Sequence, residues 1–129
     1  TSFGVVYNHF DLLVHDGRLK ECIASLEDCL RSLRETPYHA VLGRNFLGQT
    51  DAAVEYIGSF FETTSKTIQV KALYFEMNGF EINPEEWYFN GFAFKEVGDL
   101  DWLSAWDGEP GEDFVLTGME PVQKAFAEH

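Results

Sequence analysis

Basic residues are scarce in this sequence of 129 residues. It has nine lysines and arginines against 22 aspartates and glutamates, which gives a formal net charge of −13 at pH 7. A chain this acidic repels nucleic acid and anionic membranes, and it attracts basic molecules over long range. Nucleic acid and membrane are therefore the partners that the charge disfavours, and a basic protein is the partner that it favours.

Cysteine and long apolar runs are also scarce. Cys22 and Cys29 fall within one predicted helix, about 10 Å apart along its axis, whereas a disulfide needs Cα atoms within about 7 Å. We expect both to be free thiols on the buried face of that helix. No run approaches the roughly 18 apolar residues of a membrane span, and the first ten residues lack the pattern of a secretory signal. These features predict a soluble, cytoplasmic chain.

Motifs for catalysis and phosphate binding are missing as well. The sequence has no GxSxG elbow, Walker loop, GxGxxG turn or HExxH helix. The histidines, at positions 9, 15, 39 and 129, lack the short spacings of a metal site. Both cysteines stand on an apolar stripe rather than in the electropositive setting that activates a thiol. We therefore predict a non-enzymatic protein without a cofactor, with a small α+β enzyme or a regulatory or scaffold domain as the alternatives.

Apolar and aromatic side chains, in contrast, are abundant. Hydrophobic residues make up 45% of the chain, with 12 phenylalanines, five tyrosines and three tryptophans. Such a chain can bury enough surface to offset the entropy of folding, so disorder is not expected. The length fits one domain over residues 1–129. The fold class predicted is α+β, an antiparallel β-meander packed against about three helices.

The clearest helical pattern lies between Gly17 and Glu35. Asp16 fits the N-cap position before it, and Pro37 ends it. The apolar positions that recur at helical spacing are Leu19, Cys22, Ile23, Leu26, Leu30 and Leu33.

Two further helices are predicted later in the chain. One covers residues 51–63, with Thr50 as its N-cap and an apolar stripe at Val54, Ile57 and Phe61. The other follows Thr117 and Glu120, which form a capping-box pattern, and carries Val122 and Phe126.

Strand patterns are weak before the second helix and strong after it. Residues 3–14 are predicted to supply one strand or two, and residues 38–42 another. The main meander is expected from residue 67 to residue 97, with a tight hairpin turn at Asn78-Gly79, strands on both sides of it, and a second turn at residues 83–86. Gly91, inside WYFNGFAFKEV, indicates a bulge or a close backbone approach. Residues 114–116 are expected to form a brief edge strand.

The stretch DLDWLSAWDGEPGEDF, residues 99–114, combines two tryptophans with a run of carboxylates. Asp99 or Asp101 is expected to cap a short helix that continues through Trp106 and ends at Gly108 in the left-handed conformation. Trp102 and Trp106 would then share one helix face. Between residues 76 and 113 the chain has eleven acids and one base, a net charge of −10 out of −13.

This acidic, aromatic region is the candidate partner-binding site. Tryptophan is a favoured interface anchor, and surrounding carboxylates accelerate the approach of a basic partner. A solvated loop, a tryptophan lid over the core, and a calcium site are the alternatives, although the spacing does not match an EF-hand. The carboxylates expected to steer a partner are Asp99, Asp101, Asp107, Glu109, Glu112 and Asp113. Trp102 and Trp106 are the expected anchors, and Glu85, Glu86 and Trp87 form a second set of candidates.

Residues 75–107, FEMNGFEINPEEWYFNGFAFKEVGDLDWLSAWD, resemble segments of small bacterial immunity proteins of polymorphic toxin systems. The phrases NPEEWYF and DLDWLSAWD carry the resemblance, which covers about a quarter of the chain. It implies an inhibitor that neutralises a cognate toxin, in many cases a basic nuclease, by direct contact. No site residue is transferred from the resemblance.

Overall fold

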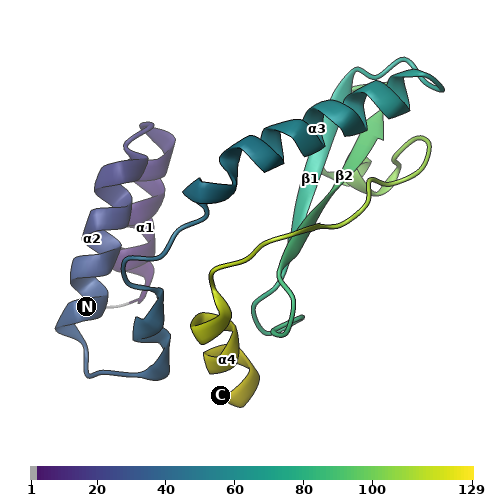
Figure 1. The fold of residues 1–129 in the computed structure, drawn as a ribbon. Helices are drawn as coiled ribbons and strands as arrows, with labels where there is room; N and C mark the ends of the chain where they lie inside the picture. The colour runs from purple at the N-terminus through teal and green to yellow at the C-terminus, as the bar shows by residue number, and fades with distance from the viewer. Residues whose placement is uncertain (1–2) are drawn as a thin grey trace. The chain divides into compact units, whose positions relative to one another are not determined.

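The computed structural model describes residues 3–129, which form four α-helices and a three-stranded antiparallel sheet (Figure 1). The predicted α+β class is therefore confirmed. The chain divides into two compact units, Thr1–Leu42 and Gly43–His129, and each is described by itself. The expectation of one domain over residues 1–129 stays a prediction.

The first unit begins with two packed helices, α1 (Phe3–His15) and α2 (Leu19–Ser32). The prediction of strands in residues 3–14 is wrong. Packing between helices outweighs the strand propensity of these residues, because the helical conformation buries Leu13 together with Cys22 of α2. The predicted cap of α2 is also wrong, because Arg18 occupies the N-cap position. Gly17, with φ +71°, turns the chain between the two helices.

A 3₁₀ helix, Pro37–Val41, follows α2 where a strand was expected over residues 38–42, so that prediction is wrong. The imidazole of His39 explains the turn. The backbone N–H of Thr36 donates to Nδ1 of His39 at 3.0 Å, which leaves Nε2 to donate to the carbonyl of Leu30 at 2.8 Å. One side chain thus fixes the 3₁₀ turn to the end of α2.

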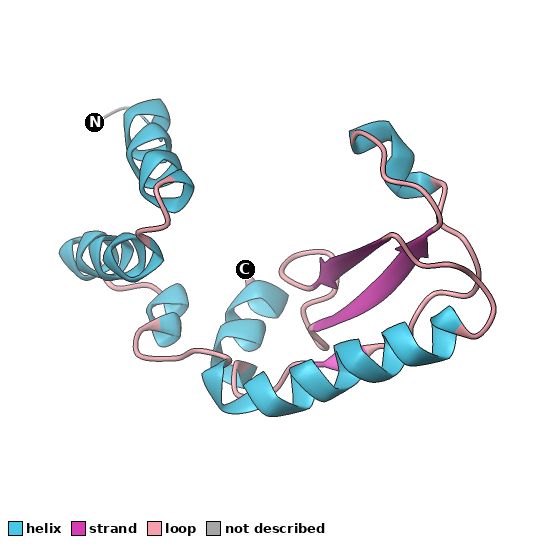
Figure 2. Ribbon diagram, turned by 90° about the horizontal axis from the view of Figure 1, so that it is seen from above, coloured by secondary structure: helices cyan, strands magenta, loops and turns pink. Residues whose placement is uncertain are grey.

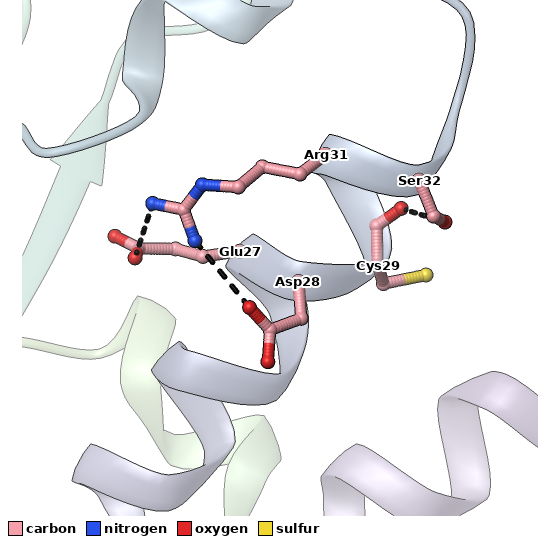
Figure 3. A network of polar contacts seen from close by, with 5 residues as sticks. All are labelled: Glu27, Asp28, Cys29, Arg31 and Ser32. Carbon is pink, nitrogen blue, oxygen red and sulfur yellow. Dashed lines mark hydrogen bonds and ion pairs between the residues drawn. The ribbon is translucent and has the colours of Figure 1, made fainter.

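The outer surface of α2 carries a small polar network (Figure 3). Arg31 lies 3.3 Å from a carboxylate oxygen of Glu27 and 3.4 Å from one of Asp28. Both cysteines are free thiols, as expected, but only Cys22 is buried, and the prediction that Cys29 is buried is wrong. A single neighbouring helix covers only a strip of α2, so much of the predicted apolar stripe is exposed as well.

The sheet forms the centre of the second unit. Its strands are β1 (Ala72–Asn78), β2 (Tyr88–Phe94) and β3 (Phe114–Val115), in the order β1-β2-β3. The antiparallel meander and the edge strand agree with the sequence, but the expected strand directly after Gly79 is absent from the described residues, which form a loop at 79–87.

The tight hairpin turn predicted at Asn78-Gly79 is wrong for a steric reason. A Cβ atom on Gly79 would lie 2.9 Å from the ring of Trp87, so this glycine makes room for a buried indole. The positive φ of the loop falls instead on Phe80, at 57°. The glycine therefore serves close packing rather than a two-residue turn.

Helix α3 (Thr50–Ser65) lies along one face of the sheet (Figure 2). The rings of Tyr56 and Phe60 contact Phe75 of β1 at centroid distances of 6.4 and 6.2 Å. The predicted apolar stripe is therefore wrong, since Val54 and Phe61 are exposed. Tyr56 and Phe60 place two adjacent aromatic rings on the sheet, whereas the predicted stripe would place one ring, Phe61, with two smaller aliphatic side chains.

The predicted caps of α3 and of the last helix, α4 (Glu120–Glu128), are wrong for a shared reason. Gln49 is the N-cap residue of α3, and its side chain bonds both backbone groups of Thr117 at 3.0 and 2.9 Å. Thr117 is thereby held away from α4, whose N-cap is Met119. The expected helix itself is present, and the Glu120 carboxylate accepts a bond from the Gly118 N–H at 3.1 Å.

Replacement of Gly91 by alanine tests the packing of α3 on the sheet. A Cβ atom there would lie 2.8 Å from both Phe60 and Phe75. We expect Gly91→Ala to lower the free energy of unfolding by about 2–3 kcal/mol in chemical denaturation, because overpacking forces rings or backbone to shift.

Gly58→Ala is the matched control, since a Cβ at that position of α3 meets nothing within 4 Å. It should raise the free energy of unfolding by about 0.5–1 kcal/mol through helix propensity. Equal effects of the two substitutions would contradict close packing at Gly91.

Candidate binding surface

The sheet presents two faces of different character. Residues paired across the strands point to the same face. The face under α3 is called the covered face. The other is called the open face, and it consists of Ala72, Tyr74, Glu76 and Asn78 of β1, Tyr88, Asn90, Phe92 and Phe94 of β2, and Val115 of β3.

Two tryptophans lie against the open face. Trp102 packs on Phe94 at a centroid distance of 3.8 Å, and Trp106 packs on Phe92 at 5.0 Å. Phe92 in turn lies 6.3 Å from Tyr74, which extends the row of rings to β1. Phe94 is fully buried, Trp102 is half-buried, and 44% of Trp106 is exposed. The row is thus buried at one end and accessible at the other.

The helix predicted to continue through Trp106 is wrong. A 3₁₀ helix, Leu100–Ser104, ends before it, with Asp99 at the N-cap position but without a side-chain cap bond. The two tryptophans therefore do not share a helix face. Both reach the open face because the following chain pairs with β2, where Asp107 forms a bridge with Ala93.

The acidic segment, residues 107–113, continues along the edge of β2. The backbone N–H of Asp107 donates to the carbonyl of Ala93, and that of Gly111 donates to the carbonyl of Gly91, both at 2.8 Å. The Asp107 carboxylate accepts a bond from the N–H of Lys95 at 2.8 Å and so takes part in the fold. Gly108 has φ +70°, the left-handed conformation expected of it, but it lies beyond the end of the 3₁₀ helix.

The other predicted carboxylates form no ion pair in the described part of the chain. Ion pairs among the described residues lie at positions 11–31 and at 124–128, and none involves an acid between residues 76 and 113. Five of the six predicted steering carboxylates are exposed, and Asp107 is half-buried. The exposed ones are Asp99, Asp101, Glu109, Glu112 and Asp113. Their charge is therefore uncompensated and accessible to a partner.

The second set of candidates is divided between the surface and the core. Glu85 and Glu86 are exposed in the loop before β2. Trp87 is only 4% exposed and packs against Phe80 and Phe126, at centroid distances of 4.7 and 5.9 Å. Its ring belongs to the core formed with α4, which leaves little of it for a partner to contact.

A cavity of about 470 Å³ lies between α3 and the acidic segment. The hydroxyl of Tyr56 donates to the carbonyl of Glu112 and so holds the acidic segment against the helix. A Cβ on Gly111 would lie 2.7 Å from that hydroxyl oxygen, so this approach requires glycine. The walls are Tyr56, Ser59, Phe60, Thr63, Thr64 and Thr67 on one side and Glu109, Pro110, Gly111 and Glu112 on the other.

Sequence reasoning missed the cavity and the aromatic rings of the open face, among them Tyr74 and Phe92. The alternation of ALYFEMN could have identified Tyr74, because every second residue of a strand shares a face. The hydroxyl residues of α3 also had a signal, since Tyr56, Ser59 and Thr63 recur at spacings of three and four. The facing wall had none, because it depends on how residues 107–113 follow β2.

Residues 3–129 contain no group of three or more histidines, cysteines or acids arranged to hold a metal ion. None of the helices in that range combines the length and the apolar composition needed to span a membrane. No protein-family model, curated protein or solved structure matches the chain.

Removal of the Tyr56 hydroxyl tests the link between α3 and the acidic segment. Burial raises the pKa of this phenol above 10.0, the nearby charges of Asp113 and Glu112 raise it further, and a backbone bond with Gly91 opposes them. The raised pKa makes the folded state hold its proton more firmly than the unfolded state. The contribution of the protonated Tyr56 phenol to the free energy of unfolding is therefore complete below a pH of about 10. It is lost as the pH rises through the pKa of the folded state.

We expect Tyr56→Phe to lower the free energy of unfolding at neutral pH by about 1 kcal/mol, the net value of one hydrogen bond. It should also remove from an ultraviolet titration of the tyrosines a phenol whose pKa is raised above 10.0. A variant that leaves the whole titration curve unchanged in shape would contradict the raised pKa.

Proposed function

We propose that this chain is a non-enzymatic binding protein of the immunity type, which neutralises a basic toxin in the cytoplasm by direct protein contact. The observation that carries the proposal is the exposed ring of Trp106 on the open face, in a region whose carboxylates have no ion-pair partner among residues 3–129. The charge and the resemblance of residues 75–107 to immunity proteins support the same function.

Binding would combine two physical contributions. Asp101 in the 3₁₀ helix that carries Trp102, and Asp99 at the N-cap of that helix, are both exposed. They attract a basic surface and raise the association rate. Trp106 and its neighbours on the open face then supply a large, rigid apolar contact that slows dissociation. Carboxylates on the inhibitor can occupy positions on a nuclease that nucleic-acid phosphates would take.

The direct test begins with capture of partners from a lysate of the native host, at low and at moderate salt, followed by mass spectrometry. The expected result is one basic protein that is released as salt rises. That protein should be toxic when expressed alone and harmless when this chain is expressed with it. A captured protein that is not toxic would instead favour a regulatory or scaffold function.

The steering role of the carboxylates predicts a change in association rate. We expect the double substitution Asp99→Asn and Asp101→Asn to slow association with the captured partner by about tenfold at low salt and to flatten its salt dependence. Stopped-flow kinetics measures both effects.

The matched control is Glu27→Gln with Asp28→Asn on α2, which removes the same charge from residues already paired with Arg31. It should change the association rate less than the first pair does. Equal slowing by both pairs would mean that only total charge matters and that these two aspartates have no special position.

The anchoring role of Trp106 predicts a separation of binding from folding. We expect Trp106→Ala to speed dissociation of the partner by about tenfold or more while it leaves cooperative unfolding in place, because 44% of this residue is exposed.

Trp87→Ala is the contrasting variant. Removal of this buried ring should cost about 3–5 kcal/mol of stability, as is usual for a large core aromatic. Thermal and chemical unfolding curves distinguish the two variants. Unfolding of Trp106→Ala at ambient temperature would show that its ring serves the core and would remove it as an anchor.

A further inference from the structure

The cavity between α3 and the acidic segment has the chemistry of a cation site. Its polar lining residues are Tyr56, Ser59, Thr63 and Thr64 of α3 and Thr67 beyond it, with Glu109 and Glu112 on the opposite wall. Neither glutamate has an ion-pair partner among the described residues. The volume, about 470 Å³, lies within the range of small-molecule pockets, roughly 300–1,000 Å³.

Thr64 gives an independent indication that a polar group belongs in this cavity. The residue is only 7% exposed, and its hydroxyl has no hydrogen-bond partner among residues 3–129. Within that range Trp87 Nε1 is the one fully enclosed side-chain atom without a partner, so the Thr64 hydroxyl reaches the open space that this residue lines. An unpaired hydroxyl at the wall of a cavity can accept a hydrogen bond from a ligand bound there.

The hydrogen-bonding directions favour a ligand that donates. Tyr56 already gives its only proton to the carbonyl of Glu112, so its hydroxyl has none left to donate to a ligand. The carboxylates of Glu109 and Glu112 accept as well. Phe60 and Pro110 add apolar surface beside these acceptors. A group with several N–H donors on an apolar stem satisfies both kinds of wall, and a guanidinium has that form.

We propose that this cavity binds an alkylguanidinium group, with Glu109 and Glu112 as the anionic partners and the Thr64 hydroxyl as a further acceptor. The group can come from an arginine side chain of the basic partner, in which case the inference rests on the proposed function, or from a free small cation. The chemistry recognised is the same in both cases.

The test is a titration of the full chain with n-butylguanidinium, followed by the backbone amide signals in NMR. We expect saturable shifts of Ser59, Thr63, Thr64 and Gly111, with a dissociation constant on the order of 1 mM for so small a ligand. N-butylurea is the neutral probe of nearly equal shape and should bind at least about tenfold more weakly. Equal binding of the two probes, or shifts that do not saturate, would overturn the proposal.

Two matched variants separate the cavity from the overall charge. Glu109→Gln with Glu112→Gln should weaken n-butylguanidinium binding by about tenfold or more, since it removes both charges that face the ligand. Glu85→Gln with Glu86→Gln removes the same charge from the loop before β2 and should leave binding unchanged. Equal weakening by both pairs would indicate a diffuse ionic atmosphere and would overturn the site.

Thr64→Val tests the hydroxyl alone at nearly constant volume. It should keep the fold, checked by the dispersion of the NMR spectrum, and weaken n-butylguanidinium binding severalfold. Undiminished binding to this variant would remove Thr64 from the site.

A blocked Gly-Arg-Gly peptide distinguishes the two sources of the ligand. Binding of the peptide at the same amides supports an arginine of the partner, and binding of n-butylguanidinium alone supports a free small cation. These measurements use the isolated chain and leave the open face intact. If neither n-butylguanidinium nor the peptide binds but a basic protein binds in a Trp106-dependent way, only the cavity proposal is overturned. If the small probes bind but no basic protein partner is found, only the proposed function is overturned.

Discussion

Helix α3 can lie against the sheet because residue 91 of β2 is a glycine and has no side chain. Phe60 and Phe75 occupy the space that a Cβ atom would need, at 2.8 Å, and Gly111 admits the Tyr56 hydroxyl in the same way, at 2.7 Å. The rings of α3 therefore reach the sheet backbone itself. This contact fixes the covered face, and it also sets the distance between α3 and the acidic segment, on which the cavity depends.

The acidic segment owes its exposure to how it is bonded. Backbone groups and the carboxylate of Asp107 attach it to β2 and the residue after it, and the carbonyl of Glu112 attaches it to α3. The other carboxylates stay outside the hydrogen bonds that hold the fold. An irregular, charged chain along a sheet edge also blocks pairing with other molecules. The same arrangement thus protects the edge of β2 and presents negative charge to solvent.

The sequence was sufficient for the parts of the fold that depend on local pattern. The periodicity around Cys22 located α2, and the run WYFNGFAFKEV located β2. Of the bulge or close approach expected at Gly91, the close approach is present. Sequence patterns gave wrong predictions where the local conformation depends on residues far away in the sequence. The buried face of α3 depends on rings of the sheet, and the conformation at Gly79 depends on Trp87. For the same reason the carboxylates could be named from the sequence, whereas the cavity wall opposite Glu109 could not.

Uncompensated charge on the acidic segment and the loops near it has a cost in the free protein. Eleven acids against one base between residues 76 and 113 repel one another, and the described ion pairs elsewhere do nothing to relieve them. The close aromatic packing around Gly91 and Gly111 supplies stability that can offset this repulsion. A basic partner would relieve the repulsion directly, so part of its binding free energy would come from strain already present in the unbound chain. On this argument the charge that weakens the isolated fold is the same charge that favours the complex.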